Sequence, residues 1–191
     1  YTDKNKYQNN KNFKSLQHRR DLSIFYFLYS SGLRISEVLQ FKMRDFPLKE
    51  FTKIKGKGDK ERFIVVLDIV NEKIKNYLDD YCNFFDGIDI LDEDPLFIKS
   101  IKGKKKSLSA RDIQRTMKSH IENFEGNYPI FSTPHSLRHS FASHILRGGA
   151  DIRTIQELLG HSSLTSTQIY TKLDEKSLLD IYDKSHPHSK G

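Results

Sequence analysis

The sequence predicts an α+β protein that is mostly helical and contains one small antiparallel β-hairpin. Apolar residues recur at helical spacing in several segments, whereas the stretch Phe51–Leu67 contains the strand-favouring residues Ile54, Phe63, Ile64, Val65 and Val66 around a Gly-containing turn. Glycines and residues that favour helix starts separate these segments. The chain has 191 residues, which is enough for one compact domain with an apolar core.

The first part of the chain begins with a polar segment. Residues 1–17 are rich in Lys, Asn and Gln and are predicted to form a linker or arm with little core of its own. Residues 19–31 carry apolar side chains at helical spacing, and Gly32 is expected to end this helix. A second, short helix is expected over Ser36–Phe41.

The middle of the chain changes from strand to helix. Within Phe51–Leu67, the run Phe63–Val66 favours strand and Gly56–Lys60 supplies a turn, which predicts the hairpin with a basic tip. Asp68–Phe85 is predicted to be a helix with one apolar face. That face consists of Val70, Ile74, Tyr77, Leu78 and Tyr81.

The remainder is expected to be helical between polar loops. The expected elements are an acidic loop over Asp86–Asp94, a short strand over Pro95–Ile98, a basic loop over Lys102–Lys106, and helices over 109–124, 133–148, 151–160, around Tyr170, and from Asp174 to before Pro187. Ser109, Thr133 and Asp151 are residue types that cap helices, and Pro134 suits a first helical position. Asp112 falls near the positive end of its helix.

Composition narrows the function classes. The formal net charge of +7 favours a polyanionic partner such as nucleic acid, although a solvated lysine-rich surface would give the same balance. The single cysteine, Cys82, excludes an intrachain disulfide and a thiolate zinc site, and it suits a reducing cytoplasm. No apolar run approaches the roughly 20 residues of a membrane span.

One pair of residues predicts a phosphate site. His135 and Arg138 are three residues apart near the start of a predicted helix, where backbone N–H groups already favour an anion. An arginine can donate two parallel hydrogen bonds to two phosphate oxygens, and Arg34 is a candidate for the second such group. His135 and His139 also have the spacing of a metal-binding helix. The zinc-protease glutamate is absent, however, and Arg138 would repel a cation, so no metal site is expected.

Three motifs together resemble a known family. They are SSGLRISEVLQF at residues 30–41, GKGDKERFIVVL at residues 56–67, and TPHSLRHSFASHILRGGADIRTIQELLGHSSLTSTQIYTKL at residues 133–173. This order and these residues resemble the catalytic half of tyrosine recombinases, and most closely the Xer-type site-specific recombinases of bacteria. The resemblance extends over roughly residues 19–187.

The resemblance implies a set of catalytic residues. They are Arg34, Lys57, His135, Arg138, His161 and the nucleophile Tyr170. Lys60 and Arg62 are the nearby alternatives to Lys57 as general acid. Glu37 is expected to orient Arg34, with a plain surface ion pair as the alternative.

The implied reaction cleaves and rejoins DNA through a 3′-phosphotyrosyl intermediate on Tyr170, without a metal, a cofactor or ATP. The stretches around the hairpin and the basic loop are candidates for contacts to the DNA backbone. These candidate residues are Lys53, Lys55, Lys60, Arg62, Lys102, Lys104, Lys105 and Lys106. Binding through them is expected to weaken steeply with salt.

The resemblance also implies an organisation and partners. Residues 18–187 are expected to form the catalytic domain and residues 188–191 a tail, while the family's N-terminal DNA-clamp domain is expected to be missing from this chain. The partners implied are a double-stranded recombination site and other protomers, which form a homo- or hetero-tetramer by exchanging the C-terminal helix. Activation by a DNA translocase and activity without one are both open from the sequence. The role implied is chromosome dimer resolution in the bacterial cytoplasm, at the nucleoid.

Three alternative functions remain open from the sequence. The first is a phage or transposon integrase, and the second is a type IB topoisomerase with the same chemistry. The third is a DNA-binding module with the same fold that does not cleave DNA. The short loops and the Xer-like ending Ser185–His188 argue against a topoisomerase.

Overall fold

The computed structural model describes residues 2–56, 61–85, 89–101, 104–122 and 133–160. Its helices are α1 (Thr2–Ser31), α2 (Ile35–Val38), α3 (Asp68–Phe84), α4 (Ala110–Glu122), α5 (Pro134–Arg147) and α6 (Ile152–Leu158), with a short 3-10 turn at Met43–Asp45. Its strands are β1 (Phe51–Lys55), β2 (Glu61–Val65), β3 (Ile98–Ile101) and β4 (Lys104–Ser107). The predicted fold class, mostly helical with a small antiparallel part, is confirmed.

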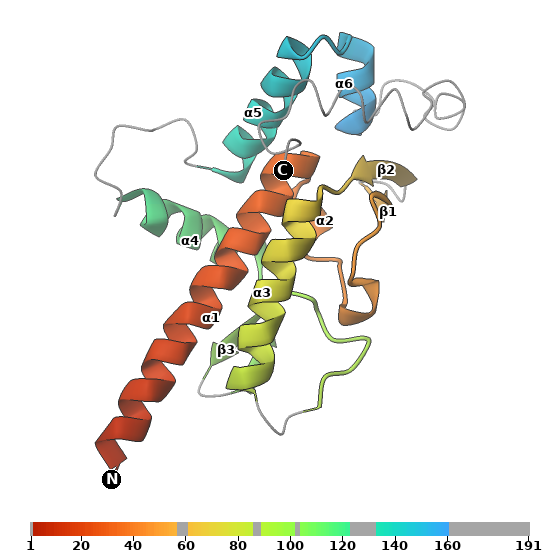
Figure 1. Ribbon diagram of the computed structural model, residues 1–191. Coiled ribbons are helices and arrows are strands. Elements are labelled where there is room, and N and C mark those ends of the chain that lie inside the picture. The colour runs from red at the N-terminus through yellow and green to blue at the C-terminus, as the bar shows by residue number, and fades with distance from the viewer. Residues whose placement is uncertain (1, 57–60, 86–88, 102–103, 123–132, 161–191) are drawn as a thin grey trace.

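Helices α1 and α3 pack side by side at the centre of the molecule (Figure 1). Each helix buries one apolar stripe, because side chains three and four positions apart lie on the same face. The buried residues of this interface are Ile24, Phe27 and Leu28 of α1 and Val70, Ile74, Tyr77 and Tyr81 of α3. The helix predicted over residues 68–85 is thereby confirmed.

Helix α1 begins at Thr2, so the helix expected to start at residue 19 is much longer than predicted. The prediction of a linker or arm over residues 1–17 is wrong for its last part, because Leu16 is buried in the main core. The Phe13 ring also packs against Phe84, and the Ser15 hydroxyl donates to Asp80 at 2.6 Å. The described contacts involve Phe13 and Leu16, and two apolar residues three positions apart are too weak a pattern to predict a packed helix in a polar segment.

The sequence predicted one of the two hairpins, β1–β2, and missed the other, β3–β4. Strands β1 and β2 pair antiparallel with Ile54 opposite Arg62, which confirms the predicted hairpin. Strands β3 and β4 form a second hairpin, so the strand predicted at 95–98 begins later and the basic loop predicted at 102–106 is partly strand. Three successive lysines in β4 carry no strand signal, and the strand is held by its backbone pairing with β3.

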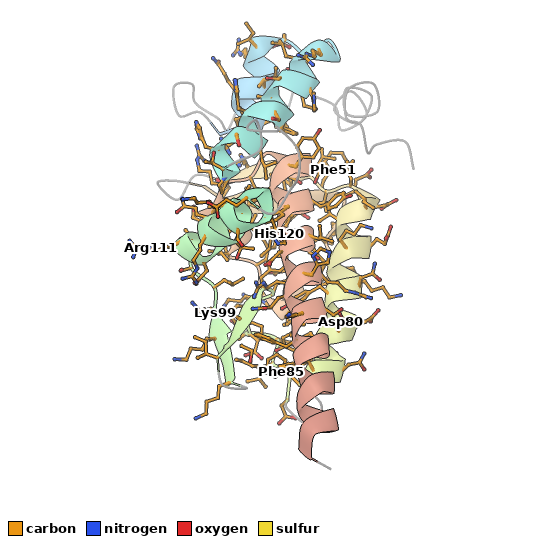
Figure 2. The ribbon with its side chains drawn as sticks, turned by 90° about the vertical axis from the view of Figure 1, so that its left-hand side faces the viewer. Phe51, Asp80, Phe85, Lys99, Arg111 and His120 are labelled. Atoms are coloured by element: carbon orange, nitrogen blue, oxygen red, sulfur yellow. The ribbon has the colours of Figure 1, made fainter. Side chains whose placement is uncertain are left out.

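Helix α4 is fixed by polar contacts at both ends (Figure 2). At its start, the Asp112 carboxylate accepts from the Ser109 N–H at 2.9 Å and from the Lys99 ammonium of β3 at 2.5 Å. Near its end, His120 lies 3.7 Å from the Asp21 carboxylate of α1. The predicted cap at Ser109 is confirmed, and the helix ends at Glu122.

Helices α5 and α6 build a second core at one end of the molecule. Thr133 accepts from the Ser136 N–H at 3.1 Å and Pro134 opens α5, as predicted. Asp151 likewise accepts from the Thr154 N–H at 2.9 Å at the start of α6. Apolar side chains from both helices then pack against β2: Val65, Phe141, Ile145, Ile155, Leu158 and Leu159. The predicted helices around Tyr170 and from Asp174 lie outside the described residues.

Candidate active site

Three arginines from different parts of the chain surround one buried carboxylate, that of Glu37. Arg62 of β2 donates from Nη1 to Oε1 at 2.6 Å and from Nη2 to Oε2 at 2.9 Å. Arg34 donates from Nη1 to Oε1 at 2.9 Å and from its backbone N–H to Oε2 at 2.7 Å. Arg138 Nη1 lies 3.9 Å from Oε2. The carboxylate therefore joins the start of α2, strand β2 and helix α5.

The same three arginines also contact three consecutive backbone carbonyls at the end of α6. Arg62 Nε donates to the Leu158 oxygen at 3.0 Å, Arg138 Nη2 donates to the Leu159 oxygen, and Arg34 Nη2 lies 3.5 Å from the Gly160 oxygen. Each of these three carbonyl oxygens thus has a different arginine as its partner. This turn is thereby held against the arginine cluster.

Local backbone features place each member of the cluster. Gly32 ends α1 with φ of 59°, and its carbonyl accepts from Arg138 Nη1 at 2.6 Å. Arg34 precedes α2, where Glu37 occupies the third helical position and satisfies the free N–H of Arg34. Strand alternation turns Arg62 inward, because its neighbours Glu61 and Phe63 are exposed.

The cluster carries an excess of two positive charges, since three guanidinium groups share one carboxylate. Burial alone would raise the pKa of Glu37, but the hydrogen bonds and charges of Arg62 and Arg34 lower it below its usual value. Burial, together with the charges of Arg34 and Arg62, lowers the pKa of Arg138 to about 10, so this guanidinium stays protonated at neutral pH. An anion at this place would offset the remaining charge.

Exposure separates the three arginines. The Arg34 side chain is 36% exposed, whereas those of Arg138 and Arg62 are 9% and 4% exposed. Arg34 is thus the arginine with the most surface available to a ligand. His135, on the first turn of α5, is also exposed.

The structure therefore brings together Arg34, Glu37 and Arg138, three residues singled out in the sequence. Glu37 hydrogen-bonds to Arg34 as expected, and because it is buried, the alternative of a surface ion pair is wrong. Three of the predicted catalytic positions lie outside the described residues: Lys57, His161 and Tyr170.

Arg62 requires a correction. It was expected to contact the DNA backbone or to replace Lys57, but its guanidinium is buried and its nitrogens donate to Glu37 and Leu158. The sequence carried one signal for this position, namely that Arg62 has the same strand parity as the buried residue Ile64. Because Arg62 is charged and follows the predicted basic turn Gly56–Lys60, the sequence favoured a surface position for it instead.

The remaining predicted DNA contacts differ in their environments. Lys53 is exposed and pairs with Glu61 at 2.5 Å, while Lys55, Lys104 and Lys106 are also exposed or half-buried at the surface. Lys105 does not fit a DNA contact, because it pairs with Asp94 at 3.2 Å and lies over the Tyr81 ring. Lys60 and Lys102 lie outside the described residues.

Within the described part of the chain, no group of three His, Cys, Asp or Glu side chains could hold a metal ion. Within the same residues, no helix combines the length and apolar character needed to cross a membrane.

The sequence matches the model of the phage integrase family over residues 4–177. The chain belongs to the phage integrase family. Its relatives within the family include tyrosine recombinase XerC of Thermodesulfovibrio yellowstonii, 45% identical over 175 residues, which are 90% of this chain and 56% of the relative. XerC of Agrobacterium fabrum is 43% identical over 171 residues, or 89% of this chain and 51% of the relative. This family member spans about half the length of the curated relatives it matches.

Solved structures agree with this membership. The XerA recombinase is 28% identical, with a TM-score of 0.60 over 94% of this chain and 61% of its own. The XerH site-specific recombinase, solved in a pre-cleavage complex with its difH substrate, is 28% identical, with a TM-score of 0.58 over 86% of this chain and 48% of its own. The predicted resemblance to Xer-type tyrosine recombinases is confirmed for this phage integrase family member.

Proposed function

We propose that this chain is the DNA-cleaving and rejoining part of a site-specific recombinase of the Xer type. The observation that carries the proposal is the arginine cluster around Glu37, which has two unbalanced positive charges and one partly exposed guanidinium, Arg34. A phosphodiester supplies an anion with two non-bridging oxygens, which is the ligand that paired arginines hold best. Family membership supports the same reading.

The reaction proposed is a transfer of the phosphoryl group from one oxygen to another. The phenolic oxygen of Tyr170 attacks the phosphorus, its proton leaves, and the bond between phosphorus and the 5′-oxygen breaks. Lys57 donates a proton to the departing oxygen, which gives a free 5′-hydroxyl and a 3′-phosphotyrosyl link. The ester energy stays in that link, so rejoining requires no ATP.

The remaining residues stabilise charge during this transfer. Arg34, Arg138 and His161 hold the phosphoryl oxygens as negative charge develops on them, and His135 assists the proton transfer from Tyr170. Tyrosine has an ordinary pKa near 10, so a cationic site is needed to make it reactive at neutral pH. Loss of one such donor typically costs about 10²–10³-fold in rate.

The substrate proposed is a double-stranded recombination site, by analogy with the XerH complex on difH. Lys53, Lys55, Lys104 and Lys106 are the described candidates for phosphate contacts, and Lys57, Lys60 and Lys102 are candidates outside the described part. Exchange of the C-terminal helix would join protomers into a tetramer, with a DNA translocase as activator. The role proposed is chromosome dimer resolution at the nucleoid in the bacterial cytoplasm, and the XerC relatives favour this over a phage or transposon role.

The first prediction tests covalent chemistry on Tyr170. The chain is incubated with a pool of short duplexes of randomised sequence, each nicked so that the cleaved fragment diffuses away. A protein–DNA adduct should form that resists detergent and disappears on protease digestion. Tyr170→Phe should bind the same duplexes and form no adduct, because it lacks the attacking oxygen.

Two results would contradict this proposal. One is an adduct formed by Tyr170→Phe, and the other is wild-type protein that binds the pool without forming any adduct. Relaxation of supercoiled plasmids of unrelated sequence would instead favour a topoisomerase.

A further inference from the structure

We propose that Arg62 is a positioning residue that keeps Glu37 from neutralising Arg34 and Arg138, the two arginines that the proposed function assigns to the phosphate. This inference rests on the proposed function, since it concerns the same site. No DNA contact is assigned to Arg62, because its Nε and both of its Nη atoms donate to protein oxygens, those of Leu158 and Glu37. Its effect on the reaction is exerted through Glu37 and through the turn after α6.

The geometry of the Glu37 carboxylate is the first argument. Arg62 contacts both carboxylate oxygens with its two Nη atoms, at 2.6 and 2.9 Å, which is the strongest arrangement for this pair of groups. Arg34 engages Oε1 with only one Nη atom, and its other contact to Glu37 comes from its backbone N–H. The second Nη of Arg34 is therefore not held by the carboxylate.

The position of Arg138 is the second argument. Its Nη1 lies 3.9 Å from Glu37 Oε2, beyond hydrogen-bond distance. If the two hydrogen bonds from Arg62 were removed, Glu37 Oε2 would lose a partner in a buried site, where an unpaired charge is costly. Arg138 is then the nearest additional cation, so the carboxylate would pair with Arg138 and reduce its charge toward a phosphate.

The turn after α6 supplies the third argument. Arg62 Nε fixes the Leu158 carbonyl at 3.0 Å, and His161 follows three residues later in the sequence. A side chain at Gly160 would begin 3.2 Å from Arg62 Cδ, and Gly160 has φ of 64°, so this close approach requires glycine. Arg62 therefore ties the orientation of Glu37 to the segment that leads into His161.

Two substitutions separate this role from simple structural support. Arg62→Lys keeps the charge but cannot hold both carboxylate oxygens and Leu158 together, so single-turnover cleavage should fall about 10–100-fold, as is typical when a group that orients a site is changed. DNA affinity, measured in a Tyr170→Phe background, should change less than about twofold, because no DNA contact is assigned to Arg62. Arg19→Met is the control, since the partly exposed Arg19 side chain pairs with Asp80 and donates to the Asn76 carbonyl about 18 Å along α1 from the cluster. It should cleave at the wild-type rate.

The decisive comparison is Arg62→Met with and without Glu37→Gln. If the freed carboxylate of Glu37 neutralises Arg138, then removing the charge of Glu37 should make the double variant cleave at least about tenfold faster than Arg62→Met. Such a gain measures the interaction between residues 37 and 62. The double variant replaces a buried ion pair with neutral groups, which folded proteins tolerate better than the loss of one partner. Thermal unfolding of each variant checks folding, and Arg62→Lys serves if Arg62→Met does not fold.

The outcomes distinguish the two proposals. The role of Arg62 is overturned if the wild type cleaves and Arg62→Lys cleaves equally fast, or if the double variant is no faster than Arg62→Met. Either result leaves the proposed function intact. Wild-type protein that forms no adduct overturns the proposed function, and the role of Arg62 falls with it. A slow Arg62→Lys variant with normal affinity, together with recovery in the double variant, supports the inference.

Discussion

At the scale of single residues, Glu37 is the side chain on which the site depends most. Its carboxylate is buried, accepts from Arg34 and Arg62, and lies near Arg138. Without it, three guanidinium groups would face one another in the protein interior with no counter-charge. Glu37 therefore orders the cluster while leaving it with an excess of positive charge.

Glu37→Gln should lower the free energy of unfolding at pH 7 by about 3–5 kcal/mol, the usual cost of removing one partner from a buried pair. The pKa of Glu37 is lowered in the folded chain, so its ionisation stabilises the fold above the unfolded value of 4.5. That contribution is lost as the pH falls through the lower folded value. The difference in unfolding free energy between wild type and Glu37→Gln should therefore shrink below about pH 4.5.

Urea unfolding at a series of pH values measures this effect. Glu50→Gln, at an exposed position, is the control and should change stability by no more than about 0.5 kcal/mol. A Glu37→Gln deficit that stayed constant from pH 7 to pH 3 would show that the carboxylate is not held as an ion.

At the scale of secondary structure, the junction between α1 and α2 connects the core to the site. Gly32 adopts a positive φ, a Cβ added there would clash with the Phe141 ring of α5, and its carbonyl accepts from Arg138. The end of one helix thus sets both the approach of α5 and the orientation of an arginine. Arg34 and Glu37, at the start of α2, come directly after this turn in the chain.

Gly32→Ala should destabilise the protein by about 2–5 kcal/mol, because about 1–2 kcal/mol of backbone strain adds to about 1–3 kcal/mol of overpacking. Gly149→Ala is a matched control, since Gly149 also has a positive φ of 97° but no atom within 4 Å of the added Cβ. It should cost only the backbone strain. Equal losses for the two variants in urea unfolding would contradict the contact with Phe141.

Much of the fold followed from the sequence, because its signals were local. The caps at Thr133, Ser109 and Asp151 and the apolar face of α3 each depend on residues within one or two helical turns. The early start of α1 and strand β4 were missed, because their polar sequences are ordered by partners distant in the chain. Within the site, Arg138 was predicted from its position near a helix start, with Arg34 as the second candidate, and the family motifs gave the same two residues. The inward orientation of Arg62 became clear only from the structure, because its partners Leu158 and Glu37 are distant in the sequence.

At the scale of the whole molecule, charge is the dominant property. The chain carries a formal net charge of +7, and the arginine cluster near α5 and α6 accounts for only part of this excess. The β3–β4 hairpin, which carries Lys104 and Lys106, lies toward the opposite end of α3 from α5 (Figure 1). A DNA duplex that contacted both the arginine cluster and this hairpin would therefore extend along the molecule.

The salt dependence of DNA binding tests that arrangement. Lys104→Ala should reduce the slope of log K against log salt concentration by about 1, the amount expected for one lost phosphate contact. Lys105→Ala should leave the slope unchanged, because Lys105 is already paired with Asp94. Identical slopes for wild type and Lys104→Ala in a binding titration would place the DNA elsewhere.

The run of carbonyls from Leu158 to Gly160 has a consequence for mutagenesis. Peptide oxygens are supplied by every amino acid, so replacing the side chains of Leu158 or Leu159 changes packing but leaves the acceptors of Arg62 and Arg138 in place. Alanine scanning would therefore overlook this part of the site. A single inserted residue would instead shift each oxygen by one place relative to its guanidinium, so the length of this turn is constrained more tightly than its composition.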